Sequence, residues 1–299
     1  MRFRILAAML TGAVILGFGG YALARPDDPL APITLFTGQI SLIDAIVFAI
    51  LSFITGITAY FAATPYGRPI APLAVPTGLA IWTFFSGSVR VLMITNTTVA
   101  EKLSVYNTFL WESFFWFVLV ALGYAGVLVA EKIKPTVLPD IIAEAAADSQ
   151  KNKGLRYAMA IVASAVVAIF CIGIFAQDVK RFDASLGNVI GQPSTGQIAF
   201  AVILSFLAAA FLCKTLLNAP PILPAAAAVV VMIVAVKGHA TPAKLTYMTE
   251  HWAAAYFPDS LCSILPIQAI AYAAIGSVAG FWLGVRYLHW HKHEREQQK

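Results

Sequence analysis

Apolar stretches of about 20 residues, almost free of charge, recur along the whole chain and are separated by short polar segments. A helix rises 1.5 Å per residue, so a stretch of this length matches the roughly 30 Å hydrocarbon layer of a bilayer. A buried helix of a soluble protein can be equally apolar, but such helices do not recur from end to end. The pattern therefore predicts an all-α integral membrane protein, a polytopic helical bundle of about eight transmembrane helices. The predicted spans lie near residues 4–24, 43–63, 76–95, 105–130, 157–176, 198–217, 221–236 and 264–287.

Two of these spans are less regular than the others. The seventh is short and follows "NAPPILP", which predicts an irregular turn, because proline is tolerated in the first turn of a helix and not in its interior. The first has Arg2 and Arg4 before it and "YALARPDD" after it, which also fits a cleaved secretory signal. Its apolar part is long for a signal, so an uncleaved anchor is favoured; cleavage would leave seven spans.

Three segments between the predicted spans have a character of their own. Residues 139–147 have the pattern of a short amphipathic helix, and the Gly- and Pro-containing loop at 179–197 is expected to be irregular. A helix is predicted to start at Pro242, with Thr241 as its cap. Its apolar stripe suits either a helix on the bilayer surface or one packed against the bundle.

Composition strengthens the membrane interpretation. The chain has 299 residues, of which 60% are apolar and only 12% charged, whereas a soluble domain is about half apolar and a quarter charged. The mean hydropathy is +0.79. One soluble core cannot hide this excess, so we expect residues 1–299 to form a single transmembrane domain with small loops.

The charges predict the orientation of the bundle. The net charge is +5, and the Lys and Arg residues fall mostly in alternate loops and at both chain ends. Because positive residues favour the cytoplasmic side, both termini are predicted to be cytoplasmic. This explains the positive charge without a nucleic-acid partner. The expected partner is the lipid bilayer of a cell membrane, with a bacterial inner membrane as the setting.

Motifs for catalysis or cofactor binding are missing from the sequence. It contains no P-loop, HExxH pair, nucleophile elbow or glycine-rich dinucleotide motif. Its three cysteines are scattered, and no histidine lies inside a predicted span, so haem held within the bundle is not expected. His289 and His293 have a metal-ligand spacing, but a charged helix end is the commoner explanation. We expect no cofactor and no metal site.

A run of glycines in the last span predicts close helix packing. Gly276, Gly280 and Gly284 follow one another at four-residue spacing and share one helix face. Small residues allow helix backbones to approach closely in lipid. The pattern leaves open whether the helix on this face belongs to the same chain or to another membrane protein.

Two opposite charges fall inside predicted spans, Arg90 in the third and Glu112 in the fourth. A short connection predicts that these two helices are antiparallel neighbours. Arg90 is then roughly 8 Å and Glu112 roughly 10 Å below the outer helix ends, so we expect the pair to meet. Thr83 and Ser86 lie on the Arg90 face, and Thr108 lies one turn from Glu112. These five residues are predicted to form a polar binding site or an interhelical clamp.

The expected function follows mainly by elimination. A non-enzymatic transport or channel-like component, or a membrane subunit of a larger complex, is favoured. The alternative is an intramembrane enzyme acting on a lipid or lipid-linked substrate. In that case Glu112 would be the acid/base, and Arg90 would hold a phosphate or carboxylate.

Overall fold

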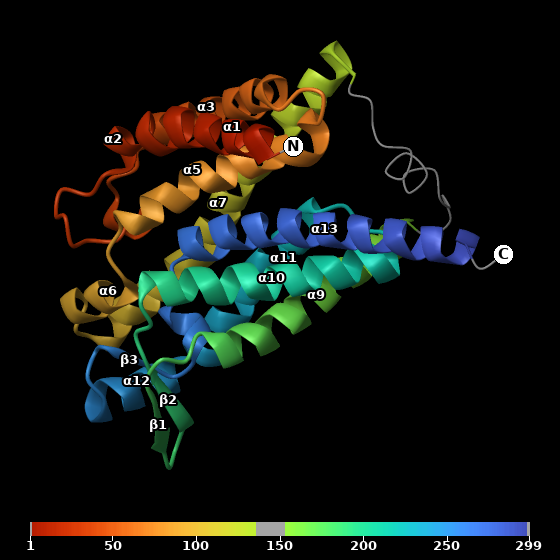
Figure 1. The fold of residues 1–299 in the computed structure, drawn as a ribbon. Coiled ribbons are helices and arrows are strands. Elements are labelled where there is room, and N and C mark those ends of the chain that lie inside the picture. The colour runs from red at the N-terminus through yellow and green to blue at the C-terminus, as the bar shows by residue number, and fades with distance from the viewer. Residues whose placement is uncertain (1, 136–152, 298–299) are drawn as a thin grey trace.

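The computed structural model describes residues 2–135 and 153–297, which form a helical fold with one small sheet (Figure 1). Within these residues, six helices are long and apolar enough to cross a membrane. The helices coincide with six of the eight predicted spans, and the all-α prediction is confirmed. They are α3 (Leu42–Ala62), α7 (Val99–Ile133), α9 (Lys153–Phe175), α10 (Thr195–Leu217), α11 (Ile222–Val234) continued by the π turn η4 (Ala235–His239), and α13 (Pro266–Gln297).

The shorter elements connect these helices or cap their ends. Those before α7 are α1 (Arg2–Gly12), the π turn η1 (Ala13–Phe18), α2 (Tyr21–Ala24), η2 (Leu35–Thr37), α4 (Gly67–Ile70), η3 (Ala71–Leu73), α5 (Ala74–Phe84) and α6 (Val89–Thr95). Those after α9 are β1 (Lys180–Asp183), β2 (Gly187–Gly191), α12 (Pro242–His251), β3 (Tyr256–Phe257) and η5 (Ser260–Ser263).

The first predicted span is helical from Arg2 to Phe18, but a turn at Gly19 and Gly20 separates this part from α2, so it is too short to be one of the six. It is nevertheless part of the packed core. The backbone of Gly12 lies so close to α5 that a Cβ atom there would overlap the carbonyl of Ala74. Further along, the indole nitrogen of Trp82 donates a hydrogen bond to the Gly17 carbonyl over 2.7 Å. Residues 2–24 therefore pack as one more helix of the bundle.

The third predicted span is broken. The helical stretch that ends with α5 at Phe84 and the helix α6 meet at 47° across residues 85–88, so the prediction of one continuous helix over 76–95 is wrong. Glycine and serine are weak helix formers, and the backbone here bonds to another part of the chain. The amide of Gly87 donates to the Ala31 carbonyl at 3.1 Å. Counted as one span, this bent pair raises the number of candidate spans from six to seven.

Helix α13 packs along α10 through its glycine face. A Cβ atom at Gly276 would overlap the carbonyl of Ile203, and one at Gly280 would overlap that of Leu207. At Gly284 the Cβ would lie 2.8 Å from the Lys214 Cβ. The glycine face of α13 is thus covered by α10 of the same chain. A partner protein stays a prediction and would have to bind another surface.

The loop predicted to be irregular at 179–197 instead contains the hairpin β1–β2, which pairs with β3 in an antiparallel sheet. Asp183 stabilises the turn, because its Oδ1 accepts hydrogen bonds from the amides of Ser185 and Leu186, both at 2.8 Å. Its Oδ2 accepts from Tyr247 and Trp252. Partial burial opposes the charge of Asp183, but these four hydrogen bonds together lower its pKa below the usual value.

The same contacts attach α12 to the rest of the molecule. Leu245 and Met248 of α12 are buried, and the helix packs on α7. Of the two arrangements that the sequence allowed for this helix, the structure has the one packed against the bundle. The amphipathic segment expected at 139–147 lies outside the described residues.

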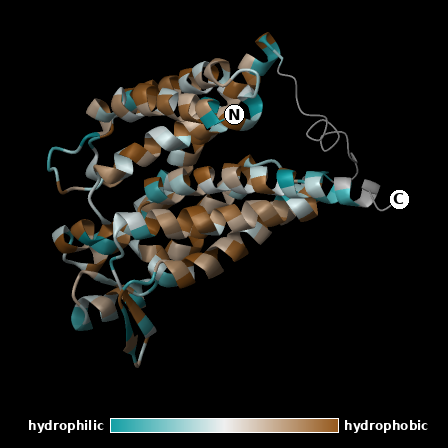
Figure 2. Cartoon of the chain, in the orientation of Figure 1, coloured by the Kyte–Doolittle hydropathy of each residue, from teal (hydrophilic) through white to brown (hydrophobic). Residues whose placement is uncertain are grey.

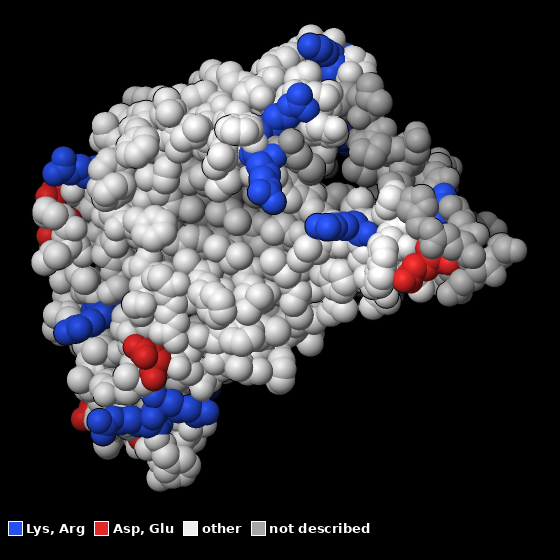
Figure 3. Space-filling model, viewed as in Figure 1, with Lys and Arg blue, Asp and Glu red and all other residues white. Residues whose placement is uncertain are grey.

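The two chain ends lie at one end of the bundle, whereas the hairpin and α12 lie at the other (Figure 1). The long helices between them are largely hydrophobic (Figure 2). On the face shown in Figure 3, charged side chains gather towards the two ends and leave a broad uncharged surface between them. Such a distribution fits a bundle that crosses a bilayer.

Candidate functional site

Glu112 is an acidic side chain that the bundle buries completely. It lies on α7. Its Oε2 accepts a hydrogen bond from the Thr34 hydroxyl at 2.6 Å, and its Oε1 accepts one from the Trp116 indole nitrogen at 2.9 Å. In the part of the chain that the structure describes, both side-chain partners of Glu112 are uncharged. The carboxylate is therefore held by neutral donors and not by a cation.

Arg90 lies elsewhere, and the expected Arg90–Glu112 pair is not formed. Arg90 is exposed on α6, and its backbone amide donates to the Gln192 side chain at 3.1 Å. The predicted depth of Arg90 assumed a continuous third helix, and the break at residues 85–88 removes that assumption. Thr34 takes the place at Glu112 that the sequence suggested for the arginine.

The other three predicted residues lie in different surroundings. Thr83 is buried, and its hydroxyl contacts the hydroxyl of Tyr272 on α13. The Ser86 hydroxyl lies in the break and accepts a hydrogen bond from the Ile33 amide at 2.8 Å. Thr108 is half-buried and bonds to the Ser104 carbonyl of its own helix. Ser86 and Glu112 thus hold the same short piece of chain, whereas Thr83 and Thr108 do not touch it through these bonds.

That piece belongs to residues 25–41, which we call the covering segment; it connects α2 to α3. Its residues Ala31 and Ile33 bond to the break, and Thr34 bonds to Glu112. Ile33 and Thr34 are each 1% exposed. Sequence reasoning missed this segment. The available signal was its composition, because "PLAPITLF" at residues 29–36 contains one polar side chain, which is unusual for a solvated loop.

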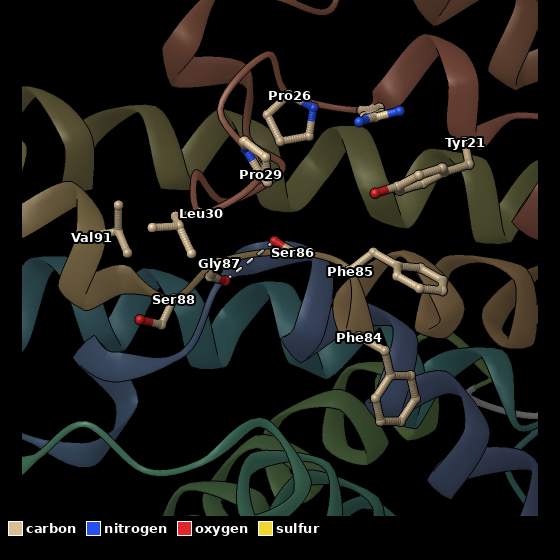
Figure 4. A pocket seen from close by; sticks show the side chains of 11 residues that line it. Tyr21, Pro26, Pro29, Leu30, Phe84, Phe85, Ser86, Gly87, Ser88 and Val91 are labelled. Carbon is tan, nitrogen blue, oxygen red and sulfur yellow. Dashed lines mark hydrogen bonds between the residues drawn. The ribbon is translucent and has the colours of Figure 1, made fainter.

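A pocket of about 540 Å³ lies between the covering segment and the break (Figure 4). The phenol of Tyr21 reaches towards it, and its ring lies 5.3 Å from that of Phe85. Gly87 is required at its floor, since a Cβ atom there would overlap the Leu30 carbonyl. Its lining is Tyr21, Arg25, Pro26, Pro29, Leu30, Phe84, Phe85, Ser86, Gly87, Ser88 and Val91.

The walls of this pocket are mostly apolar, with the side chains of Tyr21, Arg25, Ser86 and Ser88 as polar groups. The Ser86 hydroxyl is already bonded to the Ile33 amide, which leaves Tyr21, Arg25 and Ser88. Within the described residues, these three side chains make no hydrogen bond or ion pair. The pocket can therefore accept a small solute that has both an apolar part and a polar or anionic part.

Aromatic side chains enclose Glu112 on the side of α5 and α3. Trp116, which bonds to Glu112, lies edge-on to Trp82 with the ring centres 6.0 Å apart. Trp82 in turn packs against Phe48, with the ring centres 5.0 Å apart. All three rings are fully buried. Glu112 therefore has an apolar wall on one side and the covering segment on another, and its surroundings exclude bulk water.

Neither metal ligands nor known relatives add to this description. In the part of the chain that the structure describes, no group of three or more His, Cys, Asp and Glu side chains is placed to hold a metal ion. The chain matches no protein-family model, no curated protein and no solved structure.

Proposed function

We propose that the chain is a multi-pass membrane protein with eight crossings and both termini in the cytoplasm. Residues 2–24 provide the first crossing, the bent pair α5–α6 the third, and the six long helices the others. The proposal is supported by the hydropathy of these helices, by the charge bias of the loops and by the position of both chain ends at one end of the bundle (Figure 1). A bacterial inner membrane is the expected location.

Within the membrane we propose that it works as a transport component. Non-helical backbone at membrane depth is tolerated where it is buried in protein or lines a cavity, and discontinuous helices form the binding sites of many transporters. The break at residues 85–88 is non-helical backbone of this kind: it forms hydrogen bonds to the covering segment, and it lines the pocket. The pocket is the proposed entry site for the solute.

The observation that carries this proposal is the buried carboxylate of Glu112 bonded to the covering segment. An ionisable group inside a membrane bundle is costly and marks ion or proton pathways. Because its partners are neutral, binding a proton or a cation relieves that cost. A charge-assisted hydrogen bond is roughly twice as strong as a neutral one. Protonation of Glu112 therefore weakens its bond to Thr34 and loosens the covering segment, which forms one wall of the pocket.

This mechanism predicts that protons move across the membrane through the protein, and this movement can be measured directly. The purified protein is reconstituted into liposomes containing a pH-sensitive dye, and a potassium diffusion potential is applied. We expect proton influx above that of protein-free liposomes. Glu112→Gln should reduce the influx to the protein-free level, because the amide cannot exchange a proton.

Glu250 provides a matched control, since it is an exposed acid on α12. Glu250→Gln makes the same chemical change and should leave the influx unchanged. Influx in Glu112→Gln equal to that of the wild type would refute the role of Glu112, and wild-type influx no faster than that of protein-free liposomes would refute the proposal as a whole. The alternative of an enzyme using Glu112 and Arg90 together lacks support, because the two side chains are not in one site.

A further inference from the structure

A second pocket lies at the opposite end of the bundle from the hairpin, where α10 and α13 run side by side. It has a volume of about 720 Å³. Five of its six lining residues come from one short stretch of α13, and the sixth comes from α10. They are Phe211, Leu283, Arg286, Tyr287, His289 and Trp290.

The depth of this pocket follows from the length of α13. The helix begins at Pro266 at the hairpin end, and Arg286 follows twenty residues later, a rise of about 30 Å. That distance equals the thickness of the hydrocarbon layer. Arg286 thus lies at the level of the cytoplasmic headgroups, given the orientation proposed above.

The aromatic side chains of the pocket suit this level. Tyr287 is 44% and Trp290 60% exposed, and such amphipathic rings favour the boundary between hydrocarbon and water. On the hydrocarbon side, Leu283 is also exposed, and Phe211 lies edge-on to Tyr287 with the ring centres 5.7 Å apart. The pocket therefore has an apolar floor below an aromatic rim.

Arg286 supplies the charge. It is exposed, and within the described residues it makes no hydrogen bond or ion pair. Two acids of this end of the molecule already have basic partners, since Glu294 lies 3.7 Å from His291 and Glu131 lies 3.0 Å from Arg68. The guanidinium has no carboxylate against it in the described structure and can bind an anion.

We propose that this pocket binds the headgroup of an anionic phospholipid from the cytoplasmic leaflet. Arg286 pairs with the phosphate, Trp290 and Tyr287 lie at headgroup level, and an acyl chain runs along Leu283 and Phe211. Basic pockets between transmembrane helices on the cytoplasmic side are sites of this kind. The apolar floor is what favours a lipid over a free phosphate ion. The inference rests on the proposed membrane orientation and not on proton movement through Glu112.

The test compares lipid binding by variants of the purified full-length protein. Native mass spectrometry in mild detergent counts bound dioleoyl-phosphatidylglycerol and, separately, zwitterionic dioleoyl-phosphatidylcholine. The wild type should prefer the anionic lipid. A basic residue near an anionic surface contributes enough that Arg286→Gln should weaken phosphatidylglycerol binding about fivefold. Arg181→Gln removes a charge from the hairpin at the far end and should have no effect.

A spectroscopic measurement locates the bound lipid. Phosphatidylglycerol with brominated acyl chains quenches nearby tryptophan, and Trp290→Phe should remove most of the quenching that appears at low lipid concentration. Equal affinity of the wild type for both lipids would overturn the proposal. So would equal phosphatidylglycerol binding by the Arg286→Gln and Arg181→Gln proteins, or quenching that persists in Trp290→Phe.

Discussion

At the scale of single residues, Glu112 joins parts of the chain that are far apart in sequence. Thr34, which donates to it, is 78 positions away. The Thr34 hydroxyl also accepts a hydrogen bond from the Phe36 amide at 3.2 Å, so one side chain both binds Glu112 and shapes the covering segment at η2. The position of this segment therefore depends strongly on one hydroxyl group.

Removing that hydroxyl while keeping the size of the side chain tests this dependence. Thr34→Val should lower the free energy of unfolding by about 1–3 kcal/mol, because a buried carboxyl oxygen loses its hydrogen-bond donor. The measurement is thermal or denaturant unfolding of the purified protein in detergent. Thr108→Val is the control: among the described residues its hydroxyl bonds to its own helix, and the change should alter stability by less than about 0.5 kcal/mol. Equal stabilities of the two variants would show that Thr34 does not hold the segment.

The sequence indicated Glu112 but not its surroundings. An acid within an apolar run stands out in any sequence, so this residue could be found from the pattern alone. Its partner was predicted from opposite charge and matching depth, which gave Arg90. The real donors, a threonine hydroxyl and an indole nitrogen, are common in apolar segments and give no signal that distinguishes them.

At the scale of elements, hydropathy predicted where the helices lie but not where one of them breaks. The six long helices coincide with predicted spans because a helix that crosses lipid must be predominantly apolar over about 20 residues, which hydropathy detects. The break at Ser86, Gly87 and Ser88 could not be predicted in the same way. Small residues at such positions also occur in continuous helices, where they allow close packing. Whether the helix breaks or continues here depends on the hydrogen bonds to Ala31 and Ile33. These two residues belong to the covering segment, which is distant in sequence.

Glycine has different consequences on two of these helices. Gly280→Ala should lower stability by about 1–3 kcal/mol, because the added methyl group overlaps the Leu207 carbonyl and forces α13 away from α10. Gly173→Ala on α9 is the matched control, since its Cβ would enter open space. There the better helix propensity of alanine should leave stability unchanged or raise it by up to about 1 kcal/mol. The readout is the unfolding midpoint in detergent; similar losses in both variants would contradict the proposed packing role of Gly280.

At the scale of the whole molecule, the two ends of the bundle differ in build. The end with the hairpin and α12 has a small sheet held together by Asp183, whereas the other end has both chain termini (Figure 1). Hydropathy and charge predicted this division. They could not predict the sheet, because its strands are short and the hairpin turn depends on a single aspartate and on Gly187 with a positive φ of 80°.

Cysteine labelling in intact cells tests the predicted orientation. The three native cysteines are first replaced by alanine, and single cysteines are then introduced as Ala184→Cys in the hairpin and Lys132→Cys at the opposite end, both at exposed positions. A membrane-impermeant maleimide should label Ala184→Cys in intact cells and Lys132→Cys only after permeabilisation. The reverse pattern would invert the orientation, and labelling of both in intact cells would contradict a bilayer between the two ends.

The packing of α13 on α10 also sets an order for biosynthesis. The ribosome makes α13 after every other described helix. Yet α13 lies so close to α10 that a side chain at Gly276 or Gly280 would overlap the carbonyl of Ile203 or Leu207. In the proposed membrane arrangement, α10 enters the bilayer during translation with this face open to lipid or to the insertion machinery. Assembly of the bundle therefore cannot finish before α13 has been made and has packed on α10. A nascent chain stalled before Pro266 would carry an uncovered helix that membrane proteases can recognise.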